Sequence, residues 1–536
     1  MRRLFAFAVW KIFINFVRKL TEINKRKMKK LKRLKRFSIL ALMVVGAQVT
    51  WGQTDLSFNC SRDNSSAISS NAGNKCNVTL SGRTLYRDGD WNTLCLPFGV
   101  TKAQIDVESH PLHGATIKEL LTTSNLDNYG TLTLNFNTVG AIVAGKPYIV
   151  RWDNYFTIRS AADWNTFANN VSEGNTYEGM TVLLADDIDI EGNMVGTTDK
   201  SFEGIFDGGG HTITCDIQDN SAQGVAPFFC IQDATIKNLK VTGSVNGALH
   251  CAGLVGFAFG STNTITNCEV AVDVTCNSGD HCAGVLGFAQ ASGQSNTTIT
   301  NCLYSGTITG GSAAVGIICG WSDSGVTTTI SNCLANGTYN TTGTVSMIQG
   351  NGTNTETNCY QKSNESTSGL VSTLGSSNWQ ASGNYAVPIM ATINNTIDNP
   401  VFSGVTIANT NIPTDVSFTG GTFKGNYSPL TINDTNRDKI LLLTSGNKLG
   451  YAKDNATPML NAFRAYFEIP VATDGSKAVR SFVLDFGDGE DTGITTTYFT
   501  DHTASDAWYS LDGRRLNRQP TVAGLYIHNG RKVIIK

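Results

Sequence analysis

A short phrase built around an asparagine recurs five times in the middle of the chain. Its first copy is Ile236-Lys237-Asn238-Leu239, and the later copies carry cysteine where this one has Leu239. The asparagines follow one another at intervals of 29, 34, 31 and 26 residues; they are Asn238, Asn267, Asn301, Asn332 and Asn358. Such a repeat is typical of stacked coils, because one unit cannot bury its apolar face alone. The repeat therefore predicts a solenoid at the centre of the chain.

The coils are predicted to consist of strands. From Cys268 to Cys276 every second residue is apolar, whereas Glu269, Asp273 and Thr275 fall on the opposite face. This period of two is typical of a half-buried strand. Gly, Asn, Ser and Thr fill the intervals, as turns require. We therefore expect a right-handed parallel β-helix, with the asparagines forming a ladder at one bend, because Asn tolerates the left-handed backbone conformation.

Two glycine-bounded phrases repeat in step with the asparagines. They are Gly253-Leu254-Val255-Gly256 and Gly284-Val285-Leu286-Gly287. Both resemble the GLUG repeat of bacterial surface proteins, and the resemblance extends from about residue 155 to residue 365. The resemblance implies a β-helix in an exported protein, in agreement with the period-two pattern of the predicted strands.

A short helix is predicted directly before the first coil. Within residues 160–171, the side chains of Trp164, Phe167 and Val171 lie on one helical face. Ser160 and Asp163 have the spacing of a capping box. Because terminal coils otherwise expose apolar core, we expect this helix to cover the open end of the solenoid.

Four short phrases flank the solenoid and resemble, in this order, a single β-rich module of secreted Bacteroidetes proteins. Residues 91–98 and 145–152 precede the coils, and residues 399–407 and 461–467 follow them. In that module the second phrase runs soon into the third, whereas here the whole solenoid separates them. The resemblance implies that the solenoid is inserted into a loop of a β-sandwich-like domain. The alternative is a pair of independent small β domains.

The C-terminal residues resemble the sorting tail that directs exported Bacteroidetes proteins across the outer membrane. Asp512-Gly513 and Asn529-Gly530 are hairpin-turn dipeptides between apolar strands. The acidic residues just before this tail are predicted to form a linker. A calcium loop is the alternative, although their spacing is not that of an EF-hand; these residues are Asp485, Asp488, Glu490 and Asp491. The resemblance implies contact with the outer-membrane export machinery.

The first 52 residues are predicted to be a targeting segment. They hold fourteen Lys or Arg and one acidic residue. A basic stretch, 28–36, precedes an apolar stretch, 37–47, that is too short to span a bilayer. The start is Met1 or Met28. Without this segment the chain has 27 basic and 42 acidic residues, a net charge of −15, which argues against nucleic acid or an anionic membrane as partner.

These features predict an exported, all-β chain without a stable transmembrane anchor. The predicted domains are a signal peptide with an upstream extension (1–52), the first half of a β-sandwich-like domain (53–154), an inserted GLUG-like β-helix with a capping helix (155–395), the second half of the sandwich (396–475), an acidic linker (476–505) and a sorting-like β tail (506–536).

Cysteines and histidines raise the questions of disulfides and metal. Ten of the thirteen cysteines lie in the coils. Because Leu239 fills the slot that cysteine takes in later copies, we expect reduced cysteines in the core, with disulfides between neighbouring coils as the alternative. His250-Cys251 and His281-Cys282 recur in register, but adjacent strand residues point to opposite faces. We therefore expect two stacked histidines outside and two cysteines inside, and no metal or other cofactor.

The strongest candidate for catalysis is a group of carboxylates before the first full coils. Asp187, Asp189 and Glu191 share one strand face, and Asp207 follows in a glycine-rich turn. Such carboxylates could provide acid–base chemistry or bind calcium. A solvated strand face beside a glycine-rich turn is the interpretation that we favour for these residues. No Lys or Arg occurs from 241 to 360, so a cationic subsite for uronic acids is missing there.

Together these patterns favour a non-enzymatic, secreted or cell-surface protein whose solenoid is an adhesin-like or glycan-binding scaffold. The expected partners are glycans or proteins of a host or cell surface. One alternative is a polysaccharide lyase or glycoside hydrolase that uses Asp187, Asp189 and Asp207. A second alternative is a structural subunit of a cell-surface assembly.

Overall fold

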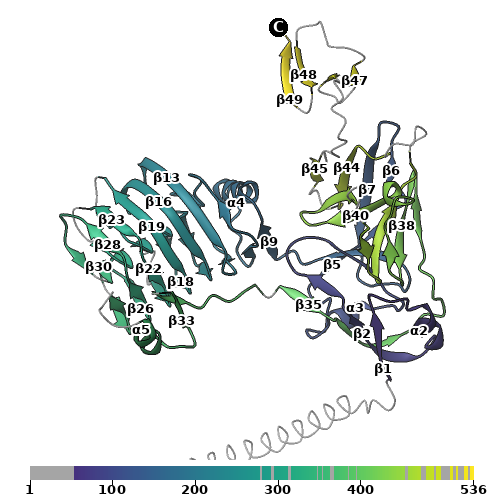
Figure 1. Ribbon diagram of the computed structural model, residues 1–536, viewed down its shortest axis with the longest axis horizontal. Coiled ribbons are helices and arrows are strands. Elements are labelled where there is room, and N and C mark those ends of the chain that lie inside the picture. Colours follow the sequence, from purple (N-terminus) through teal and green to yellow (C-terminus); the bar gives the residue numbers. More distant parts are fainter. Residues whose placement is uncertain are drawn as a thin grey trace, which may run out of the picture.

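The chain folds into a parallel β-solenoid of about seven turns, a separate group of mostly antiparallel sheets, and a small C-terminal sheet (Figure 1). The computed structural model describes residues 54–277, 281–290, 295–311, 315–346, 348–352, 354–361, 367–383, 385–393, 395–452, 457–471, 478–487, 491–495, 508–510, 515–516, 524–528 and 531–535. The predicted targeting segment lies outside these residues. Among the described residues, no helix is both long and apolar enough to cross a membrane.

The solenoid is built from three parallel sheets. The first has eight strands: β9 (Tyr155–Ile158), β10 (Thr181–Leu184), β12 (Ile205–Asp207), β15 (Thr235–Lys237), β18 (Thr262–Thr266), β21 (Ser295–Thr300), β26 (Val326–Ser331) and β31 (Asn354–Thr357). The second has nine: β11 (Ile188–Asp189), β13 (Thr212–Gln223), β16 (Lys240–Leu249), β19 (Glu269–Cys276), β22 (Leu303–Tyr304), β23 (Thr307–Gly310), β27 (Leu334–Ala335), β28 (Thr338–Asn340) and β32 (Tyr360–Gln361). The third has five: β14 (Phe228–Gln232), β17 (Val255–Phe259), β20 (Leu286–Ala289), β25 (Cys319–Ser322) and β30 (Gln349–Asn351), and a short pair joins β24 (Val315–Gly316) to β29 (Val345–Ser346).

The repeat in the sequence is the repeat of the coils. Ile236, Ile265, Ile299 and Ile330 pair with one another in adjacent strands and are fully buried. In β19, the predicted apolar face is likewise buried, while Glu269, Asp273 and Thr275 remain accessible. Period two therefore identified the interior face correctly.

The predicted asparagine ladder is present. All five asparagines have φ between 52° and 54°, in the left-handed region. Their amides bond at three of the four steps: Asn267 Nδ2 donates to Asn238 Oδ1 at 3.4 Å, and Asn301 Nδ2 donates to Asn267 Oδ1 at 3.0 Å. Asn358 Nδ2 donates to Asn332 Oδ1 at 3.3 Å. At the step between Asn301 and Asn332, Asn301 Oδ1 has no partner among the described residues. The repeated asparagine thus marks a bend in each coil.

Steric crowding between adjacent coils explains why glycine occurs at these positions of the GLUG-like phrases. A Cβ at Gly256 would clash with the carbonyl oxygen of Gly224 in the preceding coil. A Cβ at Gly284 would clash with the ring of Tyr304 and the carbonyl of Ile317. Backbones and rings of adjacent coils approach so closely at these places that no larger residue fits.

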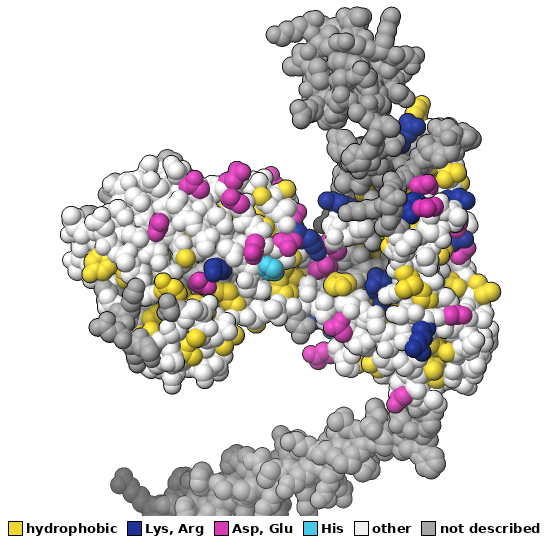
Figure 2. Space-filling model, in the orientation of Figure 1, with side chains coloured by type: hydrophobic (Ala, Val, Ile, Leu, Met, Phe, Trp, Pro, Cys, Tyr) yellow, Lys and Arg dark blue, Asp and Glu magenta, His cyan; other side chains and the backbone are white. Residues whose placement is uncertain are grey.

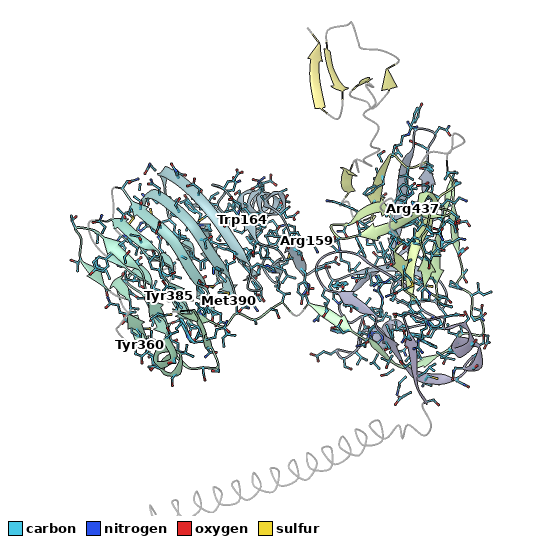
Figure 3. All side chains as sticks on the ribbon, viewed as in Figure 1. Arg159, Trp164, Tyr360, Tyr385, Met390 and Arg437 are labelled. Carbon is cyan, nitrogen blue, oxygen red and sulfur yellow. A yellow bond between two sulfur atoms is a disulfide. The ribbon has the colours of Figure 1, made fainter. Side chains whose placement is uncertain are left out.

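A helix covers the first end of the solenoid, as predicted. Helix α4 (Ala161–Glu173) begins at Ser160, whose hydroxyl accepts a hydrogen bond from the backbone N–H of Asp163. Trp164, Phe167 and Val171 are fully buried against the first coils. Figure 3 shows Trp164 beneath this helix. The Ser160 side chain therefore caps the N-terminus of the helix, and the helix covers the apolar core at this end of the solenoid.

A second covering element packs on the outer face of the solenoid. Helix α5 (Thr367–Leu374) and the hairpin of β33 (Trp379–Ser382) and β34 (Tyr385–Pro388) pack on Leu303 and Leu334, outside the nine-stranded sheet. In the last coil, Glu356 pairs with Ile330 and occupies the slot that isoleucine fills in earlier coils. A carboxylate in this slot ends the apolar column, and inward-pointing charges at an edge oppose association.

The remaining sheets form a sandwich, whose strands come partly from residues before the solenoid in the sequence and partly from residues after it. One sheet contains β4 (Asn92–Cys95), β8 (Pro147–Arg151), β5 (Thr116–Leu120), β7 (Thr131–Thr138), β6 (Asn125–Leu126), β44 (Ser481–Asp485) and β45 (Asp491–Thr495). The facing sheet contains β37 (Val416–Phe418), β38 (Gly421–Asn426), β43 (Arg464–Glu468), β40 (Ile440–Thr444) and β41 (Lys448–Tyr451). A third sheet joins β1 (Thr54–Asn59), β2 (Lys75–Ser81) and β36 (Val401–Thr406), and the small elements are α2 (Ser65–Ser70), α3 (Lys102–Ile105), β39 (Leu430–Thr431), η1 (Arg437–Lys439) and β42 (Met459–Leu460).

Strands that precede the solenoid in the sequence pair with strands that follow it, so the solenoid is inserted into this group of sheets. Strand β2 pairs with β36, and β3 (Thr84–Tyr86) pairs with β35 (Thr396–Asp398). Strand β44 pairs with β7. The assignment of residues 481–485 to an acidic linker is therefore wrong, because Phe482 and Leu484 bury their side chains between the two sheets.

An ion-pair cluster lies where the chain enters the solenoid. The Nη2 atom of Arg159 is 3.0 Å from Oδ2 of Asp88 and 2.9 Å from Oδ2 of Asp90. Both aspartates follow β3 of the sandwich, whereas Arg159 directly precedes the capping helix. Figure 3 shows Arg159 between the two bodies. Burial raises the pKa of Asp90, and the nearby Arg159 opposes that rise.

The C-terminal residues form a four-stranded sheet of β47 (Arg515–Leu516), β46 (Trp508–Ser510), β48 (Gly524–His528) and β49 (Arg531–Ile535). Strand β46 pairs antiparallel with β47, and β48 with β49. The two predicted hairpins therefore form. Their turn dipeptides lie outside the described residues.

Candidate functional site

The carboxylates that were candidates for catalysis accept hydrogen bonds from N–H groups at the bends of the first coils. Asp207 Oδ1 accepts hydrogen bonds from Gly209 N at 3.1 Å and from Asn238 Nδ2 at 3.0 Å. Its Oδ2 lies 3.2 Å from Lys237 Nζ. Asp207 thus heads the asparagine ladder, and both its oxygens have structural partners.

The other two candidates lie on an exposed edge. Asp187 Oδ1 accepts from Thr212 N at 2.8 Å and is 3.4 Å from His211 Nδ1. Asp189 Oδ1 accepts from Glu191 N at 2.9 Å. Among the described residues, no three His, Cys, Asp or Glu side chains gather as they would around a metal ion. The catalytic role of these carboxylates remains a prediction.

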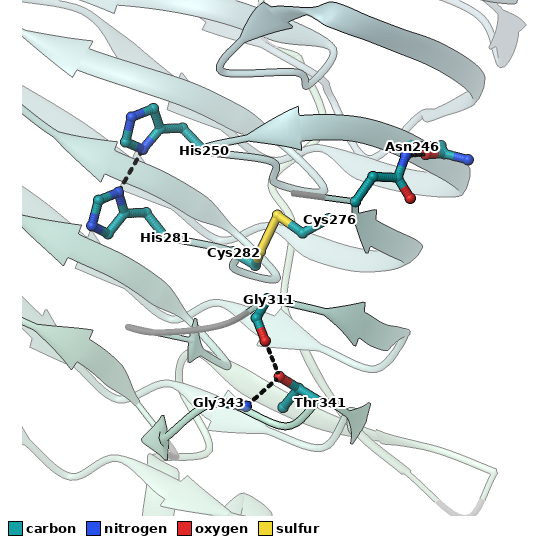
Figure 4. Close-up of a disulfide and its surroundings, with 9 residues drawn as sticks. Asn246, His250, Cys276, His281, Cys282, Gly311, Thr341 and Gly343 are labelled. Carbon is teal, nitrogen blue, oxygen red and sulfur yellow. Dashed lines mark hydrogen bonds between the residues drawn. A yellow bond between two sulfur atoms is a disulfide. The ribbon is translucent and has the colours of Figure 1, made fainter. Parts of the chain in front are cut away.

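The two predicted histidines do stack. The rings of His250 and His281 lie 4.6 Å apart and are within 5° of parallel, with their Nδ1 atoms 2.9 Å apart (Figure 4). Both residues have positive φ, so they form a second bend ladder. Cys251 and Cys282, which follow them, are fully buried.

These imidazoles belong to a larger aromatic stack that the sequence analysis missed. His250 lies 5.0 Å from Phe257 and 4.8 Å from Phe288, and His281 lies 4.1 Å from Trp321, between ring centroids. Phe257, Phe288 and Trp321 occupy the same register position of successive strands. The sequence did contain a signal for this stack, because an aromatic residue directly follows each glycine-bounded phrase. The stack rigidifies the outside of the five-stranded sheet.

One disulfide joins Cys276 to Cys282 (Figure 4). The other eight coil cysteines are free; they are Cys215, Cys230, Cys251, Cys268, Cys302, Cys319, Cys333 and Cys359. The eight free cysteines agree with the expectation of reduced cysteines in the coils. The disulfide lies within one coil, so among the described residues no disulfide joins neighbouring coils. Burial raises the pKa of the interior thiols, including Cys215, Cys230, Cys251 and Cys319, each to about 12.

The most regular array of accessible groups lies on the eight-stranded sheet. Strands β18, β21 and β26 each place three outward residues at alternate positions. We call these nine side chains the threonine grid: Thr262, Thr264 and Thr266; Asn296, Thr298 and Thr300; Thr327, Thr329 and Ser331. The residues between them point inward and are buried. Thr355 and Thr357 extend two columns of the grid onto β31.

Strand geometry fixes the spacing of the grid. Adjacent strands are about 4.8 Å apart, and alternate residues of one strand are about 6.6 Å apart. The grid is therefore a nearly flat lattice of eight hydroxyl groups and one amide group. Ser331 Oγ donates to Thr300 Oγ1 at 3.0 Å, so one column is bonded across its coils. The asparagine ladder borders this column, because Asn267, Asn301 and Asn332 directly follow its members.

The threonine grid itself carries no charge. None of the grid residues is charged. Charged residues border the grid: Asp233 Oδ1 accepts a hydrogen bond from Thr262 N at 2.8 Å, and Lys237 and Glu356 lie at the two ends. Figure 2 shows another view of the same property, since uncharged side chains and backbone dominate the visible face of the solenoid. Charged side chains are denser on the sandwich in this view. The solenoid therefore suits a neutral partner.

A shallow pocket on the sandwich is a weaker candidate. It encloses about 620 Å³ and is lined by residues of β37, β38 and β43. Lys424 Nζ lies 2.6 Å from Glu468 Oε2 and 3.6 Å from Asp415 Oδ2. The bond to Glu468 raises the pKa of Lys424. Because two carboxylates already neutralise this cation, the pocket offers little to an anionic ligand.

The fold and these surfaces define the chain as an all-β protein with a parallel solenoid inserted into a sandwich. No family model matches the chain, and no curated protein matches it. Among solved structures, it is similar to the "crystal structure of a putative immunoglobulin A1 protease from Bacteroides ovatus", at 18% identity over 44% of this chain and 91% of that chain. The TM-score is 0.31, which carries no argument about fold or function.

Proposed function

We propose that the solenoid is a non-enzymatic binding surface for neutral polysaccharides on an exported protein. The observation that carries this proposal is the threonine grid, a flat, uncharged lattice of hydroxyl groups that continues over successive coils. Hydroxyl groups donate and accept hydrogen bonds, as the hydroxyl groups of sugars do. A periodic surface suits a periodic ligand.

The chemistry of the grid favours weak contacts in large number. One hydrogen bond adds a net stabilisation of about 0.5–1.5 kcal/mol. Several contacts along one polymer act together, because each bound segment raises the effective concentration of the next. The absence of Lys and Arg from 241 to 360 argues against uronic acid polymers. Neutral glycans are therefore the preferred class.

Export supports a role outside the cell. The basic and apolar stretches at 28–47 have the composition of a signal peptide. The GLUG-like phrases and the sorting-like tail support assignment to the exported surface proteins of Bacteroidetes. The solenoid would then present its grid to glycans of a host or of another cell.

The proposal is tested by co-sedimentation of the purified protein with insoluble neutral polysaccharides, followed by analysis of the supernatant for oligosaccharides. We expect depletion of the protein from solution and no released sugar. Release of oligosaccharides would exclude the non-enzymatic role. Selective recovery of a protein partner from an outer-membrane fraction, without glycan binding, would favour an assembly subunit.

An enzymatic alternative rests on the 3.4 Å approach of His211 Nδ1 to Asp187 Oδ1 at an exposed edge. A carboxylate beside an imidazole can move a proton. If any turnover is found, the variant with Asp187, Asp189 and Asp207 all changed to Asn tests this site. Full activity in that variant would exclude the three carboxylates, and lost activity with retained glycan binding would establish them.

A further inference from the structure

Four thiols form a column inside the solenoid. Cys268, Cys302, Cys333 and Cys359 each follow a ladder asparagine, and backbone bonds hold them in register. Leu334 N donates to Cys302 O at 2.9 Å, and Tyr360 N donates to Cys333 O at 2.9 Å. Neighbouring thiols are close enough to hydrogen-bond to one another. The column therefore ends with a pair of thiols, those of Cys333 and Cys359.

The last thiol of the column differs from the others. Cys268, Cys302 and Cys333 are fully buried, whereas Cys359 is partly exposed. It lies in the final described coil, between β31 and β32, which pair with the preceding coil on one side only. A hydrogen bond from the Cys333 thiol lowers the pKa of Cys359, while burial raises that of Cys333. Cys359 is thus the accessible nucleophile and Cys333 the buried one.

The backbone spacing suits a bond between these two sulfur atoms. Parallel strands about 4.8 Å apart place paired Cα atoms within the range that disulfides span. In-register side chains must still approach slightly to form the bond. The last coil can make that adjustment, because no further coil of the described residues packs on its far side. Cys302 lacks this freedom, since coils lie on both sides of it.

The described part of the solenoid already contains one disulfide. Cys276 and Cys282 are six residues apart in the sequence and are joined within one coil, with Cα atoms 6.4 Å apart. Unlike that pair, Cys333 and Cys359 lie together at the partly exposed end of the stack. This exposed position favours a disulfide that forms in oxidising surroundings and is reduced again in reducing ones.

We propose that Cys333 and Cys359 form a redox-active pair that small-molecule disulfides oxidise. The Cys359 thiolate attacks one sulfur of the small disulfide, forms a mixed disulfide and releases one thiolate. The Cys333 thiol loses its proton to water, and its sulfur attacks Cys359 Sγ and releases the second thiolate. The protein loses two electrons and two protons, and the small disulfide becomes two thiols. The product ties the last coil to the coil before it.

The test treats the full chain with oxidised glutathione, blocks remaining thiols under denaturing conditions, and maps the peptides by mass spectrometry. We expect a peptide pair joined through Cys333 and Cys359, reversed by dithiothreitol. Cys333→Ser should instead retain glutathione on Cys359, because the second thiol is missing. Cys302→Ser is the matched control and should still form the bond.

A second readout does not depend on the variants folding fully. In the wild type, limited proteolysis should cut the segment after 361 at the same rate before and after oxidation, while cleavage within 334–361 slows several-fold on oxidation. The proposal is overturned if Cys359 keeps glutathione in the wild type, if Cys333 pairs with Cys302 instead, or if neither thiol reacts while Cys359 remains accessible to alkylation.

Discussion

The Ser331 hydroxyl donates a 3.0 Å hydrogen bond to the Thr300 hydroxyl of the preceding coil. This contact links two members of the threonine grid across the stack, so the outward hydroxyl groups are ordered before any ligand arrives. Ordered groups lose less conformational entropy on binding than mobile ones. The contact makes the grid a preorganised surface.

Binding to the grid should depend little on salt. Because the grid is uncharged, no counterions are released when a neutral glycan binds. We expect the fraction of protein bound to an insoluble neutral glycan to change less than twofold between low and high sodium chloride. Binding that collapses in high salt would place the contact on charged residues of the sandwich instead.

The asparagine ladder should stabilise the solenoid through both backbone conformation and amide bonds. Asn267→Ala is expected to lower the free energy of unfolding by about 2–3 kcal/mol, since φ is 54° at this position and two amide contacts are lost. Asn267→Gly should lose less, because glycine accepts this φ without strain. Denaturant titration followed by circular dichroism measures both. Equal losses would remove the conformational part of the explanation.

Glu356 should keep the open end of the solenoid from associating. It occupies the slot of Ile330 in the last coil. Glu356→Ile extends the apolar column to the edge and is expected to produce dimers or larger species in sedimentation velocity experiments. Glu356→Gln keeps a polar group there and should behave as the wild type does. A monomeric Glu356→Ile protein would show that other features protect this end.

The joint at Arg159 should respond to pH through Asp90. Burial raises the pKa of Asp90 in the folded state, so its ionisation costs stability as pH increases through that pKa. The stability of the wild type relative to Asp90→Asn should therefore be greatest at acid pH and fall as pH rises. Thermal unfolding of both proteins across this range measures the difference. A difference that grows with pH would mean that the pairing with Arg159 outweighs burial.

Much of this architecture could be read from the chain, for reasons visible at particular residues. Asn238 and its counterparts indicated a bend because few other residues accept positive φ, and Trp164, Phe167 and Val171 indicated a cap through their helical spacing. The stacking of His250 on Phe288 could not be predicted, because it depends on the backbone path of each turn between the strands. Strand β44 was missed because its few apolar residues adjoin an acidic run.

The grid itself was only partly predictable. The sequence indicated outward hydroxyl and amide groups, but unequal repeat lengths hid which residues share a column. Pairing of Thr264 with Thr298 and of Thr298 with Thr329 settled that register. For the carboxylates, sequence could place Asp187 and Asp189 on one face, but it could not show that Asp207 is bound to Asn238.

The most direct test compares two triple variants in co-sedimentation with an insoluble neutral polysaccharide. Thr264→Val, Thr298→Val and Thr329→Val together remove one column of grid hydroxyl groups and keep the β-branched shape. Thr214→Val, Thr242→Val and Thr307→Val together remove three accessible hydroxyl groups from the nine-stranded sheet, two of them in one column. We expect the first variant to lose at least tenfold in affinity and the second to bind as the wild type does. Equal binding by both variants would contradict a glycan-binding role for the grid.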